Sequence, residues 1–348
     1  MASTIAPKSN RELARERARP LTDWRTLLGS AITDPGELLR RLGLADHPLA
    51  ARIDAAPAFR IRVPEPYLAC IRPSDPADPL LRQVLALDAE NLDVPGFTRD
   101  PLAEATQNPL PGLLHKYHGR ALLIAAGGCA VHCRYCFRRH FPYADNNPGR
   151  RGLEAALDYL GQQTDIREII LSGGDPLMLD DEALAGLVAR LEAIPHLQRL
   201  RIHTRFPVVI PQRLTAGLVD LLARTRLKPT VVLHMNHPRE LETGVVAALS
   251  PLRDARVPLF NQAVLLRGVN DSVAVLAALA EACHDSGITP YYLHLLDRVA
   301  GSAHFEVDEA EARDLYDALA ARLPGYMLPR LARERPGAPG KVPLPPRW

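Results

Sequence analysis

The pattern of hydrophobic and polar positions along the chain changes near residue 120. Beyond that point, short apolar runs alternate with amphipathic segments of helical length. The apolar runs predict strands at 121–126, 168–172, 199–204, 230–235, 258–266 and 289–296. The amphipathic segments predict helices near 151–162, 180–193, 211–224, 238–249, 272–286 and 308–322. Strands in alternation with helices predict an α/β fold with a parallel sheet and right-handed crossovers. Because six such units are too few for a closed eight-fold barrel, we expect a partial (β/α)6, TIM-like barrel.

The first part of the chain is rich in proline and predicts only short elements. Five prolines between residues 64 and 79 interrupt the pattern too often for long helices or strands. One helix is predicted to begin at Pro35, with Asp34 as its N-cap. We therefore expect an N-terminal helical appendage over 1–110, the barrel over 111–330 and a C-terminal segment over 331–348.

Composition and charge argue against two classes of partner. The chain has 42 basic and 40 acidic residues, so its charge gives no reason to expect a nucleic-acid partner, and the mixed-charge run 11–17 predicts a solvent-exposed helix face. No apolar stretch approaches the roughly 18–20 residues that span a bilayer, and no membrane partner is expected. The first residues also lack the apolar segment of an export signal. Five cysteines, three of them within eight residues, suit a reducing compartment and a metal centre, so we expect the cytoplasm.

The candidate chemistry begins at those three cysteines. Cys129, Cys133 and Cys136 follow the first predicted strand with the spacing C-x3-C-x2-C. Thiolates are the usual ligands of iron–sulfur clusters, and three of them can hold three corners of a cubane. No fourth cysteine lies nearby, so one iron would be left for a small molecule. The spacing resembles that of the radical S-adenosylmethionine (SAM) superfamily, in which SAM chelates the open iron of a [4Fe–4S] cluster.

Two other interpretations of the cysteines stay open at this point. A structural zinc site needs four ligands, and His132 or His140 could supply the fourth. Zinc motifs, however, usually come as paired C-x2-C units. A ferredoxin-like electron carrier would need a fourth cysteine for its cluster. A non-catalytic iron–sulfur protein is therefore the alternative from a different functional class.

A glycine-rich turn at the end of the second predicted strand adds to this picture. The sequence Ser-Gly-Gly-Asp-Pro includes Gly173, Gly174 and Asp175. Glycine allows the backbone to approach a ligand closely. By resemblance to radical SAM enzymes, this turn is expected to contact the SAM amino group.

Longer strings extend the resemblance over most of the chain. They are DPLLRQV at 78–84, PGLLHKYH at 111–118, CAVHCRYCFRRHFPY at 129–143, PYYLHLLDRVAGSAHF at 290–305 and LARE at 331–334. Together they are similar to the lysine 2,3-aminomutase family. The strongest similarity is to its shorter bacterial branch, which makes (R)-β-lysine for modifying elongation factor P. The resemblance implies a radical SAM fold, and an isomerase that uses SAM, a [4Fe–4S] cluster and pyridoxal 5′-phosphate (PLP).

The resemblance also implies roles for individual residues around PLP and SAM. Lys341 matches the lysine that binds PLP covalently, and Arg120 matches the arginine on the PLP phosphate. Tyr117 is similar to a tyrosine beside the PLP ring. His234 and Gln262 match contacts to SAM, although each could also be a satisfied polar residue near a strand end.

For the substrate, the resemblance implies one cationic and two anionic contacts. Arg138 matches the arginine that binds the α-carboxylate of L-lysine, and Asp297 matches an acid that binds the ε-ammonium. Glu334 stands where the aminomutases that act on free lysine have Asp. Two carboxylates around an ammonium make a sensible electrostatic cage.

Partners follow from the same resemblance. It implies an external one-electron reductant and a functional link to an elongation factor P lysyl-ligase, and it leaves homo-oligomers open. The alternative within the family is an aminomutase that makes free β-amino acids for metabolism.

Overall fold

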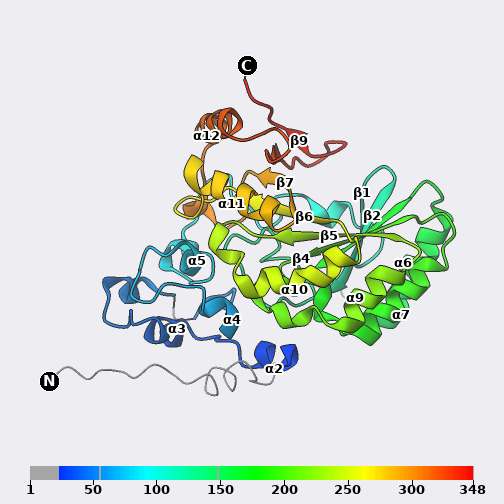
Figure 1. The fold of residues 1–348 in the computed structure, drawn as a ribbon, viewed down its shortest axis with the longest axis horizontal. Helices are drawn as coiled ribbons and strands as arrows, with labels where there is room; N and C mark the ends of the chain where they lie inside the picture. The colour runs from blue at the N-terminus through cyan, green and yellow to red at the C-terminus, as the bar shows by residue number, and fades with distance from the viewer. Residues whose placement is uncertain (1–22, 55, 147–148, 348) are drawn as a thin grey trace.

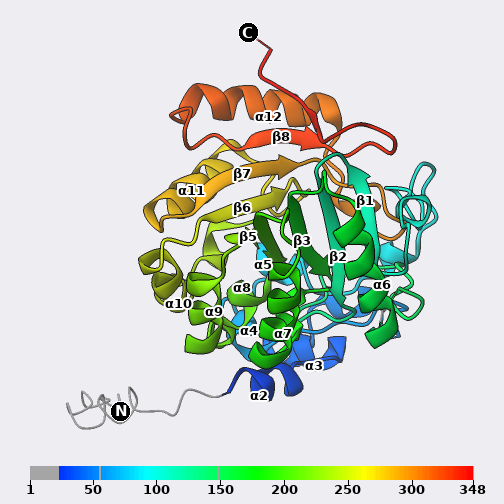
Figure 2. The same cartoon turned by 90° about the vertical axis from the view of Figure 1, so that its right-hand side faces the viewer.

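The structure is a computed structural model, and it describes residues 23–54, 56–146 and 149–347. Its centre is one sheet in which each strand pairs with the next along the chain (Figures 1 and 2). The strands are β1 (Leu113–Tyr117), β2 (Arg120–Ala126), β3 (Glu168–Gly173), β4 (Arg199–Thr204), β5 (Lys228–His234), β6 (Leu259–Val264), β7 (Thr289–His294), β8 (Arg330–Arg333) and β9 (Val342–Pro343). Strands β2 to β8 are parallel, and β1 and β9 are antiparallel additions at the two edges.

A helix follows each parallel strand from β2 to β7. These helices are α6 (Gly149–Gln162), α7 (Asp181–Glu192), α9 (Ala216–Arg224), α10 (Thr243–Asp254), α11 (Val273–Asp285) and α12 (Glu309–Arg322), with the short α8 (Phe206–Val209) before α9. Helices α6, α7, α9, α10 and α11 lie along the outside of the curved sheet (Figure 2). The six strand–helix units and the linear strand order confirm the predicted partial barrel.

All six predicted strands are present, and the pattern missed three others. β8 is a seventh parallel strand that pairs with β7, and its two central residues, Leu331 and Ala332, are buried. It has only four residues and an arginine at each end, so it gives no apolar run to recognise. The edge strands were missed because β1 has only five residues, of which His115 and Lys116 are polar, and β9 has only two residues.

Two helices differ from their predicted bounds. The segment 211–224 begins as a 3-10 turn (η5, Pro211–Arg213), and α9 starts only at Ala216, where Thr215 caps it. The segment 238–249 begins as another 3-10 turn (η6, Pro238–Glu240). Helix α10 then continues past Pro251, because Leu252 beyond it is fully buried in the core.

The N-terminal region consists of short helices, as its prolines predict. They are α2 (Trp24–Gly29), α3 (Pro35–Arg41), α4 (Glu65–Leu68) and α5 (Pro79–Arg82), with 3-10 turns between them (Figure 1). Asp34 is the N-cap of α3 and accepts a 2.6 Å hydrogen bond from the Glu37 backbone. Trp24 packs edge-on against Phe206 of α8, with ring centroids 5.5 Å apart. The region therefore shares one hydrophobic core with the barrel.

The proposed boundaries at 110 and 330 stay predictions, and the run 11–17 lies outside the described residues. In the described part of the chain, no helix has the length and apolar character needed to cross a membrane.

Candidate active site at the carboxyl ends of the strands

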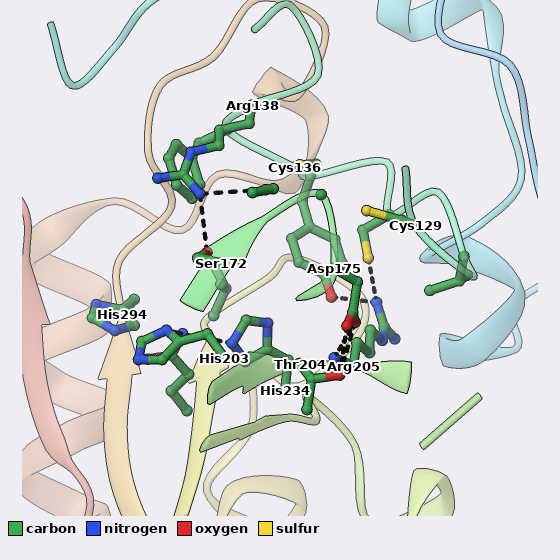
Figure 3. Close-up of a pocket in the computed structure, with 18 of the residues that line it drawn as sticks. Cys129, Cys136, Arg138, Ser172, Asp175, His203, Thr204, Arg205, His234 and His294 are labelled. Carbon is green, nitrogen blue, oxygen red and sulfur yellow. Dashed lines mark hydrogen bonds between the residues drawn. The ribbon is translucent and has the colours of Figure 1, made fainter. Parts of the chain in front are cut away.

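Two adjoining cavities open where the parallel strands end. We call the first the cysteine cavity, because Cys129, Cys133 and Cys136 line it. Figure 3 labels Cys129 and Cys136 in its wall. The second, the Arg120 cavity, is lined by Arg120 together with Lys116 and Tyr117. The residues common to both walls are Phe137, Arg138, Ser172, His203, His234, Gln262, Glu334 and Lys341. A group bound in one cavity is therefore next to a group bound in the other.

The cysteine loop follows β2 directly, as its position in the sequence predicts. Burial raises the pKa of Cys129, and the nearby Cys136 and Cys133 raise it further. Burial likewise raises the pKa of Cys136 to about 11, with Cys133 adding to the shift. Thiols that repel one another when ionised favour a bound cation, which stabilises thiolates.

The chemistry of the three cysteine side chains fits an iron–sulfur cluster. Among the described residues, no three His, Cys, Asp or Glu side chains are close enough together to hold one metal ion. In a cubane cluster each thiolate binds a different iron, so its ligands are spaced more widely. All three thiols nevertheless face the same cavity. The residues present thus suit a three-cysteine cluster with one further iron open to the cavity.

The glycine turn after β3 packs directly on the cysteine loop. A Cβ atom at Gly174 would lie 2.1 Å from the Gly128 carbonyl oxygen, and one at Gly173 would lie 2.5 Å from that of Ala126. Gly173 also has a φ of +122°, which side chains rarely tolerate. Glycine is therefore required at both positions for the two loops to meet.

Asp175 secures the same turn rather than facing the cavity with a free carboxylate. Its oxygens accept hydrogen bonds from the Thr204 hydroxyl at 2.7 and 2.9 Å and from the backbone of Arg205 at 2.8 Å. The backbone N–H groups of Leu177 and Phe206 donate to it as well. Asp175 thereby ties the turn to the end of β4.

Lys341 lies deep in the site, held by the hairpin of β8 and β9. Its Nζ is 2.9 Å from Nε2 of His294 and 4.8 Å from the centre of the Tyr292 ring. Glu334 lies 3.9 Å away. Burial lowers the pKa of Lys341, although Glu334 and Asp297 oppose the shift. A larger share of neutral amine suits a lysine that must form a covalent bond with an aldehyde.

Arg120 lies in the second cavity with its guanidinium 4.7 Å from the centre of the Tyr117 ring. In the described ranges, no carboxylate forms an ion pair with Arg120. The hydroxyl of Tyr117 donates a 3.0 Å hydrogen bond to Glu334. An unpaired guanidinium and a lysine in connected walls fit the phosphate and the aldehyde of PLP.

Arg138 and Asp297 both line the cysteine cavity. Arg138 is almost fully buried and makes a two-pronged ion pair with Glu104, at 2.7 and 2.8 Å. Burial raises the pKa of Asp297 to about 7, and the charge of Glu334 adds to the shift. Asp297 lines the cysteine cavity beside Glu334, so the structure brings the predicted substrate residues into one site.

His234 and Gln262 are neighbours at the ends of β5 and β6. Their side-chain nitrogens lie 2.8 Å apart, and both residues line both cavities. Burial lowers the pKa of His234 to about 3, so its ring is neutral. His203 of β4 lies edge-on to His234, and its buried Nε2 has no hydrogen-bond partner among the described residues.

The sequence reasoning missed several residues of this site. Some of them are polar side chains near the ends of apolar strands. Such side chains face the inside of the sheet, so the pattern would have revealed His203, Tyr292 and His294. Others had no local signal: Glu104, Lys116 and Arg205. Arg205 donates to the Cys133 sulfur at 2.7 Å, although 72 residues separate the two in the chain.

Comparison with known proteins agrees with this geometry. Residues 123–280 match the Radical SAM superfamily. The L-lysine 2,3-aminomutase of Escherichia coli K12 is 50% identical over 323 residues, which cover 92% of this chain and 94% of the relative. That of Haemophilus influenzae is 48% identical, over 92% of this chain and 95% of the relative. That of Clostridium subterminale is 35% identical, over 94% and 78%. Among solved structures, a radical SAM methyltransferase from Sphaerobacter thermophilus matches 64% of this chain and 68% of its own, at 18% identity and a TM-score of 0.43.

The chain is therefore a radical SAM enzyme, and the matched residues 123–280 include the cysteine loop. Within the superfamily it belongs to the lysine 2,3-aminomutase family, which makes it an isomerase of the aminomutase type. The cofactors of this family are a [4Fe–4S] cluster, SAM and PLP. The predicted family and cofactors are thus confirmed.

Proposed function

We propose that this chain converts L-lysine into (R)-β-lysine by moving the α-amino group to the neighbouring carbon. The observation that carries the proposal is the common wall of the two cavities. It contains Lys341 and lies within one continuous site with the three cysteines. A substrate amino group that replaces Lys341 on the PLP aldehyde would therefore be next to a radical source at the cysteines.

The residues divide between the cofactors as follows. When bound, the cluster supplies the electron that cleaves SAM, and PLP carries the migrating amino group. Cys129, Cys133 and Cys136 would hold the cluster, and Lys341 would hold PLP. The remaining cofactor contacts are proposed on position: Arg120 and Tyr117 on PLP, and Gly173, Gly174, His234 and Gln262 on SAM. Asp175 serves SAM indirectly, because it fixes the turn.

The substrate would lie between one cation and two anions. In this proposal Arg138 binds the α-carboxylate, while Asp297 and Glu334 bind the ε-ammonium; all three line the cysteine cavity, which supports the proposal. Each contact matches one charged group of lysine. A site of this kind favours a long diamino acid over an amino acid with an apolar side chain.

The activity can be tested directly. We expect anaerobic protein with a rebuilt cluster, PLP, SAM, dithionite and L-lysine to yield (R)-β-lysine, identified by chiral chromatography. The same mixture without SAM is the control and should yield none. Unchanged lysine in the complete mixture, with cluster and PLP both present, would rule out the proposal.

The product is proposed to serve elongation factor P in the cytoplasm, through a lysyl-ligase that takes β-lysine. The resemblance to the shorter bacterial branch supports this route, and the alternative is release of β-lysine into metabolism. Coupling the purified enzyme to the ligase and elongation factor P should add one β-lysyl group to the factor, measured by intact mass. If the ligase prefers L-lysine even when β-lysine is supplied, the metabolic alternative is favoured. A homo-oligomer is also proposed, and its mass in solution can be measured by light scattering.

A further inference from the structure

A chain of buried ion pairs lines the Arg120 cavity at the proposed substrate site. Glu104, from the proline-rich N-terminal region, pairs with Arg138 and also lies 3.1 Å from Nζ of Lys116 on β1. Lys116 lies 3.8 Å from Glu334 as well. The exposed fractions of these side chains are 5% for Glu104, 6% for Arg138 and 11% for Lys116. Burying charged groups this deeply costs desolvation free energy, which pairing offsets only in part. We therefore ask what these ion pairs do for the site.

Glu104 fixes the direction of the Arg138 side chain. Its two carboxylate oxygens accept hydrogen bonds from Nε and Nη2 of the guanidinium. On the other side, Nη1 donates to the Ser172 hydroxyl at 3.1 Å and to the Gly173 carbonyl at 3.3 Å. A guanidinium has five N–H donors, so these bonds hold it from two sides and leave one Nη2 hydrogen.

The positive charge of Lys116 offsets the negative charge of Glu104. An arginine paired with one carboxylate is neutral as a unit and attracts a second carboxylate weakly. With Lys116 added, the three side chains carry a net charge of +1, and the second carboxylate near Lys116, that of Glu334, is farther from its Nζ (3.8 Å) than that of Glu104 (3.1 Å). Burial would raise the pKa of Glu104, but Arg138 and Lys116 outweigh it and lower the pKa to about 2. Glu104 therefore stays ionised across the working range of pH.

We propose that Glu104 and Lys116 are positioning residues that make Arg138 a selective binder of the substrate α-carboxylate. Glu104 sets the orientation of the guanidinium, and Lys116 keeps the group cationic. This inference rests on the proposed function, because it takes Arg138 as the carboxylate contact. It predicts that the site distinguishes lysine from the same diamine without a carboxylate.

The test compares L-lysine with 1,5-diaminopentane. Binding is followed by the absorbance of PLP-loaded protein without a reductant, so no turnover is needed. We expect Glu104→Gln to weaken lysine binding by about tenfold or more and to leave diaminopentane within about twofold, because only lysine uses Arg138. Lys116→Gln should reduce the preference for lysine similarly by removing the net charge. A role in stability alone would not change the ratio of the two affinities.

Asp181→Asn is the matched control. Asp181 pairs with the fully buried Arg213 outside both cavities, so its loss should leave the ratio unchanged. An unchanged ratio in Glu104→Gln, with PLP still bound, would overturn the inference. If that variant cannot hold PLP, the ratio in Lys116→Gln decides. A wild-type protein that binds neither compound would instead contradict the proposed function.

Discussion

Nζ of Lys341 lies 2.9 Å from Nε2 of His294, and this pair joins the C-terminal segment to the end of β7. His294 lines the cysteine cavity, and burial holds its pKa well below the ordinary value, with Lys341 adding to the shift. The neutral ring can therefore accept a hydrogen bond from the lysine nitrogen. The pairing keeps that nitrogen inside the common wall of the two cavities, where we propose that PLP is attached.

The first prediction concerns that lysine. Lys341→Ala should remove the covalently bound PLP and reduce lysine rearrangement to background, because Lys341 is the one lysine among the described residues that lines both cavities. The measurement is borohydride reduction followed by peptide mass analysis. PLP found on a peptide without residue 341 would show that the assignment is wrong. His294→Ala should keep the attachment and slow it, since the amine then loses its partner.

The second prediction concerns the cluster. Cys136→Ser should lower iron and sulfide from about four per chain to near background, because two thiolates are too few to hold a cubane cluster. Chemical iron and sulfide analysis after anaerobic rebuilding measures this. Cys283→Ser is the control. Cys283 lies in the core of α11, where burial raises the pKa of its thiol to about 12, so the cluster should be retained. Equal iron content in both variants would contradict the ligand assignment.

The third prediction concerns the contact between the two loops. Gly174→Ala should destabilise the protein by about 2 kcal/mol or more, because the new methyl group meets the Gly128 backbone. Gly186→Ala, at an exposed position of α7 with open space around it, should stabilise by about 0.5–1 kcal/mol. Denaturant unfolding of the two variants measures both effects. A neutral Gly174→Ala would mean that the two loops do not pack as described.

The fourth prediction concerns pH. The pKa of Asp297 is raised to about 7, so its carboxyl becomes protonated and neutral as the pH falls through that value. Its attraction for the lysine ε-ammonium is then lost. The preference for lysine over norleucine, which lacks the ammonium, should fall by up to about tenfold per pH unit below 7. Asp297→Asn should show a smaller preference that hardly changes with pH. An unchanged preference in the wild-type protein would exclude Asp297 from that contact.

Local patterns explain what could be predicted from the sequence. The apolar strands β2 to β7 are buried between other layers, so their composition reveals them, and the cysteine ligands lie within eight residues of one another. Long-range pairs left no such pattern. Glu104 and Arg138 are 34 residues apart, and Glu104 comes from the proline-rich region that predicted no site. Neither residue type nor spacing indicates that a buried carboxylate there will pair with an arginine after the cysteine loop.

The central claim is that one site brings the cysteines and Lys341 close enough for a hydrogen atom to pass between SAM and lysine. L-lysine with deuterium at C3 tests it most directly, by mass analysis of the SAM recovered after turnover. We predict deuterium at the 5′ carbon of SAM and in the β-lysine product. β-Lysine formed without any label in SAM would contradict the claim.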